Sequence, residues 1–156
     1  MKGQVCSEVE VDVAANKAWE LYGTLELAKF IEQKLPLIHK IEVVQGDGGV
    51  GTILNLVFVP GTPGLSSYKE KYTKVDDEKH IKEAEVIKGG YLDYGFTMYK
   101  IRVEIIDKAH NNNECVIKST IEYEVKDEVA SSVTDLVTIK PLEDIAKLAK
   151  THLEAV

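Results

Sequence analysis

The amino-acid sequence predicts an α+β fold in which a curved, seven-stranded antiparallel sheet wraps around a long C-terminal helix. Apolar and polar residues alternate in several short segments, which is the period of strands with one exposed face. The connections between most of these segments are too short for crossover helices, so the strands should be antiparallel. An amphipathic pattern near the C-terminus predicts the helix. The length of 156 residues favours one domain, residues 1–156, with a cavity between sheet and helix.

One strand and two short helices are expected in the N-terminal quarter of the chain. Valines alternate with polar residues over Val5–Val13, which predicts a strand. Helical spacing follows in Ala14–Tyr22 and again in Leu27–Leu35, and Pro36 ends the second helix. Two short helices in succession suggest a V-shaped pair that bridges strands.

Six more strands are expected between turn-forming stretches rich in glycine, proline or polar residues. Their predicted bounds are Ile41–Val44, Ile53–Val59, Ser67–Val75, Ile81–Ile87, Phe96–Ile106 and Val116–Lys126. The turns between them are predicted at Gly46–Gly51, Pro60–Gly64, Asp76–Lys79, Gly89–Gly90 and His110–Glu114.

The last predicted element is an amphipathic helix that follows Asp127. Its apolar residues recur at spacings of three and four from Val129 to Leu153, which predicts one buried face. Pro141 lies inside this stretch and predicts a kink or a restart of the helix there.

Charge and cysteine content exclude several classes of function. The formal net charge is −7 and no basic patch appears, which argues against nucleic acid or an anionic membrane as the main partner. Cys6 and Cys115 form no CxxC pair, and none of the four histidines is spaced as a metal-ligand pair, so we expect no metal. The beginning of the chain lacks an apolar signal region, and no apolar run reaches membrane-spanning length, so a cytoplasmic location is expected.

The stretch Gly46–Gly51 matches the GxGxxG pattern of dinucleotide-binding proteins. That chemistry requires a helix after the glycines, because the helix N-terminus holds the pyrophosphate. The following segment, Thr52–Val59, is β-branched and apolar and instead predicts a strand. We therefore interpret the glycines as a hairpin loop.

Two charged residues fall on strand faces that should be buried. Alternation places Glu70 between Tyr68 and Tyr72 on one face, and Lys82 with Ala84 and Val86 on the next strand. A glutamate and a lysine facing one cavity would compensate each other's burial and could transfer protons near neutral pH. The alternative is that both side chains extend to the mouth of the sheet as an ordinary exposed pair.

The element order, the Gly46–Thr52 loop and the Gly89–Gly90 pair resemble the birch-pollen-allergen superfamily. It includes the pathogenesis-related class 10 proteins, major latex proteins and cytokinin-specific binding proteins of plants. The resemblance implies a helix-grip (START-like) fold with a hydrophobic cavity under the C-terminal helix. Members are carriers or receptors for small apolar metabolites and hormones, and a few are enzymes.

Within that superfamily the sequence is similar to norcoclaurine synthases. The segments that carry this similarity are Gly46–Leu54, Phe58–Gly61, Tyr68–Lys71, Gly89–Asp93 and Cys115–Ser119. Such enzymes condense dopamine with 4-hydroxyphenylacetaldehyde in a Pictet–Spengler reaction.

The resemblance also implies catalytic residues. The Tyr, Glu and Lys of the subgroup match Tyr68, Glu70 and Lys82, but its Asp falls on Ile101. The implied roles are general acid for Lys82, acceptor of the ring proton for Glu70, and a hydrogen bond to a substrate hydroxyl for Tyr68. No cofactor is implied.

The first functional hypothesis is therefore a norcoclaurine-synthase-like condensing enzyme of the lyase class, acting on a dopamine-like arylethylamine and an aldehyde. The alternative is a non-catalytic carrier of a cytokinin, flavonoid or alkaloid with a role in defence, which the loss of the carboxylate at Ile101 favours. Ribonuclease activity is disfavoured by the net charge. We expect a monomer or weak dimer that binds a small hydrophobic or aromatic ligand, with contacts from Tyr72, Ala84, Val86, Tyr99, Ile101 and Leu142.

Overall fold

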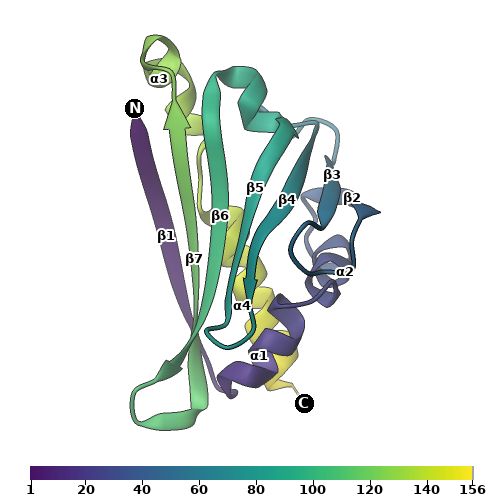
Figure 1. The fold of residues 1–156 in the computed structure, drawn as a ribbon, viewed down its shortest axis with the longest axis vertical. Helices are drawn as coiled ribbons and strands as arrows, with labels where there is room; N and C mark the ends of the chain where they lie inside the picture. The colour runs from purple at the N-terminus through teal and green to yellow at the C-terminus, as the bar shows by residue number, and fades with distance from the viewer. Residues whose placement is uncertain (156) are drawn as a thin grey trace.

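The computed structural model describes residues 1–155, and these form one sheet with helices packed against it (Figure 1). The strands are β1 (Lys2–Val11), β2 (Ile38–Gln45), β3 (Ile53–Phe58), β4 (Ser67–Asp76), β5 (Ile81–Gly89), β6 (Phe96–Lys108) and β7 (Asn111–Val125). The helices are α1 (Ala15–Tyr22), α2 (Glu26–Lys34), α3 (Asp127–Val133) and α4 (Lys140–Glu154), with 3₁₀ turns η1 (Gly90–Tyr94) and η2 (Thr134–Leu136).

The sheet follows the order β1-β7-β6-β5-β4-β3-β2, and all neighbouring strands are antiparallel. Consecutive hairpins build it from β2 to β7, and β1 pairs with β7 at the far edge. The helix α4 crosses behind the sheet in Figure 1. The predicted α+β fold is confirmed in its seven-stranded antiparallel sheet, its two short helices after β1 and its C-terminal helix.

The first strand does not have its predicted bounds. It spans Lys2–Val11 instead of Val5–Val13, because its pairing with β7 extends to Lys2 opposite Glu124. A strand is held by the backbone hydrogen bonds of its ladder, so it continues through polar residues wherever a partner strand continues. For the same reason β7 begins at Asn111, inside the predicted His110–Glu114 turn.

The C-terminal region is not one continuous helix. The helix α3 ends at Val133, η2 follows, and α4 restarts at Lys140. Of the two possibilities predicted for Pro141, the restart is therefore correct: this proline lies in the first turn of α4, where a missing backbone N–H has no helical partner to lose. The buried face of α4 consists of Ile145, Ala146, Ala149 and Leu153.

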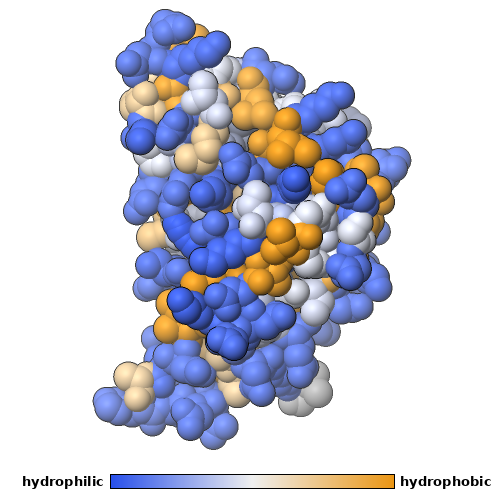
Figure 2. Space-filling view, in the orientation of Figure 1, coloured by the Kyte–Doolittle hydropathy of each residue, from blue (hydrophilic) through white to orange (hydrophobic). Residues whose placement is uncertain are grey.

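The sheet face seen in Figure 2 is mostly hydrophilic, with scattered hydrophobic side chains. The larger hydrophobic residues that are exposed include Val43 and Val44 on β2, Ile87 on β5 and Ile106 on β6. In the described part of the chain, no helix has both the length and the apolar composition needed to cross a membrane.

Candidate active site

A pocket lies between the inner face of the sheet and the helices α1, α2 and α4. Most of its wall is apolar and comes from leucine, isoleucine, valine and alanine side chains of α2, β2, β3, β6 and α4. The polar or aromatic residues in the wall are Tyr22, Phe58, Tyr68, Glu70, Tyr72, Lys82 and Ser119. A mostly apolar pocket with a few convergent polar groups is the usual form of a small-molecule site.

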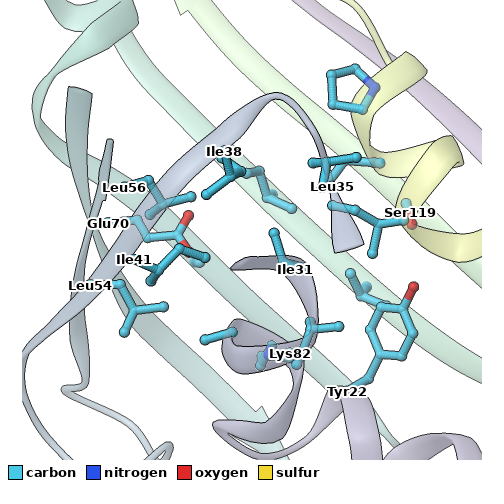
Figure 3. Close-up of a pocket in the computed structure, with 18 of the residues that line it drawn as sticks. Tyr22, Ile31, Leu35, Ile38, Ile41, Leu54, Leu56, Glu70, Lys82 and Ser119 are labelled. Carbon is cyan, nitrogen blue, oxygen red and sulfur yellow. The ribbon is translucent and has the colours of Figure 1, made fainter. Parts of the chain in front are cut away.

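The neighbouring strands β4 and β5 bring Glu70 and Lys82 into this pocket, although the two residues are not paired across the ladder (Figure 3). Their relative exposure is only 9% and 5%, respectively. The interpretation of the two residues as an exposed pair at the mouth of the sheet is therefore wrong. Alternation within each strand accounts for the burial, because Tyr68 and Tyr72 flank Glu70 on the same buried face.

Burial shifts the pKa values of both Glu70 and Lys82 toward neutral pH. Desolvation raises the pKa of Glu70 from 4.5 to about 7, although the positive charge of Lys82 opposes this. Desolvation lowers the pKa of Lys82 from 10.5 to about 8, and the negative charge of Glu70 opposes that shift. Each group can therefore exchange a proton close to physiological pH, as a general acid or base must.

The Lys82 ammonium is free to interact with a ligand. Among the described residues, its Nζ has no hydrogen-bond partner, although it is fully buried. It lies over the ring of Tyr72, 4.6 Å from the ring centroid, in a cation–π contact. All the N–H groups of this ammonium therefore remain available as donors.

Tyr68 is held in place by packing on the same buried face. Its ring lies 5.3 Å from the ring of Phe58 and 6.4 Å from that of Tyr91. Burial, with the charge of Glu70 as a second cause, raises the pKa of Tyr68 well above its usual value, so its hydroxyl stays neutral. Gly90, at φ +55°, leaves room for this ring, because a Cβ there would lie 2.9 Å from the Tyr68 Cβ.

The structure brings most of the predicted site residues together. The pocket wall contains Tyr68, Glu70, Lys82, Tyr72, Ala84, Ile101 and Leu142. Val86 and Tyr99 are buried but lie outside this wall, contrary to the expected ligand contacts. The Tyr99 ring instead stacks on Tyr91 at 3.9 Å, and Val86 pairs with Glu70 across the β4–β5 ladder. The roles of the seven wall residues remain predictions.

Sequence reasoning missed Tyr22 and Ser119, which line the pocket from α1 and β7. Tyr22 follows the helical spacing of α1, which by itself indicates a packing residue. Ser119 carried the same signal as Glu70 and Lys82, because it is a polar residue between Ile117 and Ile121 on a buried face.

Metal ligands do not gather in this pocket or elsewhere in residues 1–155: no group of three or more His, Cys, Asp or Glu is arranged to hold an ion.

Comparison with known proteins shows the family to which this fold belongs. The pathogenesis-related protein Bet v 1 family, which is the birch-pollen-allergen group that the sequence resembles, matches residues 1–155. The chain belongs to this family. It is 45% identical over 154 residues to norbelladine synthase of Narcissus pseudonarcissus, a match that covers 98% of this chain and 93% of that protein.

Two norcoclaurine synthases are also similar to this Bet v 1 family member. S-norcoclaurine synthase 2 of Papaver somniferum is 39% identical over 155 residues, which cover 98% of this chain and 66% of that longer protein. The structure of norcoclaurine synthase from Thalictrum flavum in complex with dopamine and hydroxybenzaldehyde has a TM-score of 0.88 and 38% identity, and the match covers 99% of this chain and 88% of that one. The predicted similarity to norcoclaurine synthases is thus confirmed.

Proposed function

We propose that this protein catalyses a Pictet–Spengler condensation of a dopamine-like arylethylamine with an aldehyde in the pocket between sheet and helices. The observation that carries the proposal is the burial of Glu70 and Lys82 on adjacent strands, each with a pKa shifted toward neutrality. Relatives that are norbelladine and norcoclaurine synthases, one of them solved with dopamine and hydroxybenzaldehyde, support it.

The first chemical stage is loss of water. The amine nitrogen adds to the aldehyde carbon, and a proton moves from nitrogen to oxygen to give a neutral carbinolamine. Lys82 then donates a proton to the carbinolamine hydroxyl, the C–O bond breaks, and water and an iminium ion remain. A lysine with a pKa of about 8 is mostly protonated at pH 7 and is a stronger acid than an exposed lysine.

The second stage closes the new ring. A carbon of the electron-rich aromatic ring attacks the iminium carbon, and the π electrons of the C=N bond pass to nitrogen. The Glu70 carboxylate removes the proton from the attacked ring carbon, which restores aromaticity. The neutral Tyr68 hydroxyl can hydrogen-bond a substrate hydroxyl, and the narrow apolar pocket holds the two reactants in orientation.

The direct test mixes the protein with dopamine and 4-hydroxyphenylacetaldehyde and resolves the product enantiomers. We expect one enantiomer to dominate and Lys82→Ala and Glu70→Ala each to remove most of the activity. Lys71→Ala is the matched control, because Lys71 is exposed on the opposite face of β4. A racemic product formed at the rate seen in buffer alone would overturn the proposal.

The second candidate function is a carrier of small aromatic metabolites without chemistry. It is favoured by Ile101, an apolar residue in the pocket wall at the position where the norcoclaurine synthase pattern has a carboxylate. Calorimetry against cytokinins, flavonoids and alkaloids separates the two functions. Tight binding of one compound, together with no condensation of any amine and aldehyde pair, would favour the carrier.

A further inference from the structure

Two hydroxyl groups in the pocket wall have no role in the chemistry described above. Tyr22 ends α1, its side chain is 2% exposed, and its hydroxyl has no hydrogen-bond partner among residues 1–155. Ser119 lies on β7, is also 2% exposed, and lines the same pocket. Figure 3 shows the Tyr22 ring extending from α1 into the pocket, with its hydroxyl on the side where Ser119 lies.

The sheet register places these hydroxyls at a defined position relative to Lys82. Val103 pairs with Lys82 on one side and with Ser119 on the other, so the three residues form one row across β5, β6 and β7. Two strand spacings separate Lys82 from Ser119, which is about 10 Å between their Cα atoms. One benzene ring with a substituent at each end spans the gap between their side chains.

A buried hydroxyl without a partner destabilises the folded protein, because it loses its hydrogen bonds to water and gains none. Phenylalanine would fill the same space without that cost. Tyr22 therefore retains a costly group whose donor and acceptor point into an apolar pocket. Burial raises its pKa, so the group remains a neutral phenol.

We propose that the Tyr22 and Ser119 hydroxyls form a subsite for the phenol hydroxyl of one aromatic substrate, whose other end lies beside Lys82 and Glu70. The proposal rests on the proposed condensation for the identity of that other end. A neutral pair of hydroxyls matches a neutral phenol, which both donates and accepts a hydrogen bond. The protein should therefore select a 4-hydroxylated ring over the unsubstituted ring.

Calorimetric binding of matched pairs tests this without requiring turnover. One pair is 4-hydroxybenzyl alcohol and benzyl alcohol, which represent the aldehyde without forming imines with lysine. The other pair is 4-hydroxyphenylethylamine and 2-phenylethylamine, which represent the amine. We expect the wild type to bind the hydroxylated member of one pair about tenfold more tightly, as one or two hydrogen bonds would give. The pair that shows the preference identifies which substrate uses the subsite.

Tyr22→Phe and Ser119→Ala should each reduce that preference to about twofold or less, because each weakens binding of the hydroxylated member more than binding of the unsubstituted member. Tyr123→Phe, which removes a phenol hydroxyl from β7 outside the pocket wall, is the control and should keep the preference. Tyr22→Phe should also leave the thermal midpoint unchanged or raised, because it removes an unpartnered hydroxyl.

Three results would overturn the subsite. The first is a wild-type protein that binds none of the four compounds, or that binds both members of each pair equally. The second is a Tyr22→Phe variant that keeps the full preference for the hydroxylated member. The third is a Tyr22→Phe variant with a lowered thermal midpoint and no binding of either member, since the hydroxyl would then be structural. A hydroxyl preference that depends on Tyr22, in a protein that condenses no substrates, would leave the subsite standing and refute the proposed function alone.

Discussion

The Lys82 ammonium nitrogen lies 4.6 Å from the centroid of the Tyr72 ring and has no hydrogen-bond partner among residues 1–155. The face of an aromatic ring therefore contacts this buried cation where a hydrogen-bonded carboxylate would be the more usual arrangement. Such a contact stabilises the charge while leaving every N–H group of the ammonium for a ligand. The proposed acid role of Lys82 depends on this arrangement.

Replacing the Tyr72 ring should therefore change the acidity of Lys82. A cation–π contact favours the protonated amine, so Tyr72→Leu should lower the pKa of Lys82 and move the alkaline limb of the kcat/KM profile down by about half to one pH unit. Tyr72→Phe keeps the ring face and should leave the limb in place. An unchanged alkaline limb in Tyr72→Leu would show that the ring does not hold the charge.

The pH dependence of kcat/KM should be bell-shaped and narrow. Glu70 must be ionised to accept a proton, so activity should fall as the pH drops below about 7, the raised pKa of this carboxyl. Lys82 must be protonated to donate, so activity should fall above about 8. Glu70→Gln should abolish the acid limb and lower the rate at least about 100-fold. A profile that is flat between pH 6 and pH 9 would contradict both assignments.

Stability should also depend on the ionisation of Glu70. Its pKa is raised on folding from 4.5 to about 7, so its stabilising contribution is complete below pH 4.5 and is lost as the pH rises through 7. The free energy of unfolding of Glu70→Gln, relative to wild type, should therefore rise by about 3 kcal/mol between pH 4.5 and pH 8. Urea unfolding at both pH values measures this.

The control for that measurement is Glu20→Gln, because Glu20 is exposed on α1. The stability difference between this variant and the wild type should be the same at pH 4.5 and pH 8. An equally constant difference for Glu70→Gln would show that burial does not raise the pKa of this carboxyl.

A carboxylate introduced at position 101, in place of Ile101, should raise the pKa of Lys82. Ile101 lines the pocket and pairs with Ala84, one row of the sheet from Lys82. In Ile101→Asp the new negative charge should raise the pKa of Lys82 and move the alkaline limb upward. Ile101→Asn adds a similar polar group without the charge and should lose comparable stability, about 2 kcal/mol, without moving the limb. If the alkaline limb of the kcat/KM profile lay at the same pH in both variants, the introduced charge would have no effect on the pKa of Lys82.

Gly90 should be required for the position of Tyr68. Both Gly90 and Gly61 have positive φ, at +55° and +88°, so an alanine is strained at either position. At Gly61 the added Cβ would meet nothing within 4 Å, whereas at Gly90 it would lie 2.9 Å from the Tyr68 Cβ. Gly90→Ala should therefore lower both the thermal midpoint and kcat/KM, and Gly61→Ala only the midpoint. Equal kcat/KM values would show that Tyr68 does not depend on this contact.

The candidate site was predictable as far as local patterns extend. Alternation in β4 and β5 is enough to place Glu70 and Lys82 on the inner faces. It did not reveal the register shift between Tyr72 and Lys74, which sets the row in which Lys82 lies. It also placed Val86 and Tyr99 on inner faces correctly, but could not indicate that neither side chain reaches the pocket.

The sequence by itself determined the order of the elements and the face of each strand on which a side chain lies, because the strand period of two is a property of the local backbone. Only the tertiary structure decided that the sheet face carrying Glu70 and Lys82 is shielded from solvent, since helices distant in the sequence must cover it. The same holds for the unpartnered hydroxyl of Tyr22. A hydrogen-bond partner is a matter of proximity in space, and residues far apart in the chain meet only when the whole sheet has closed around α4.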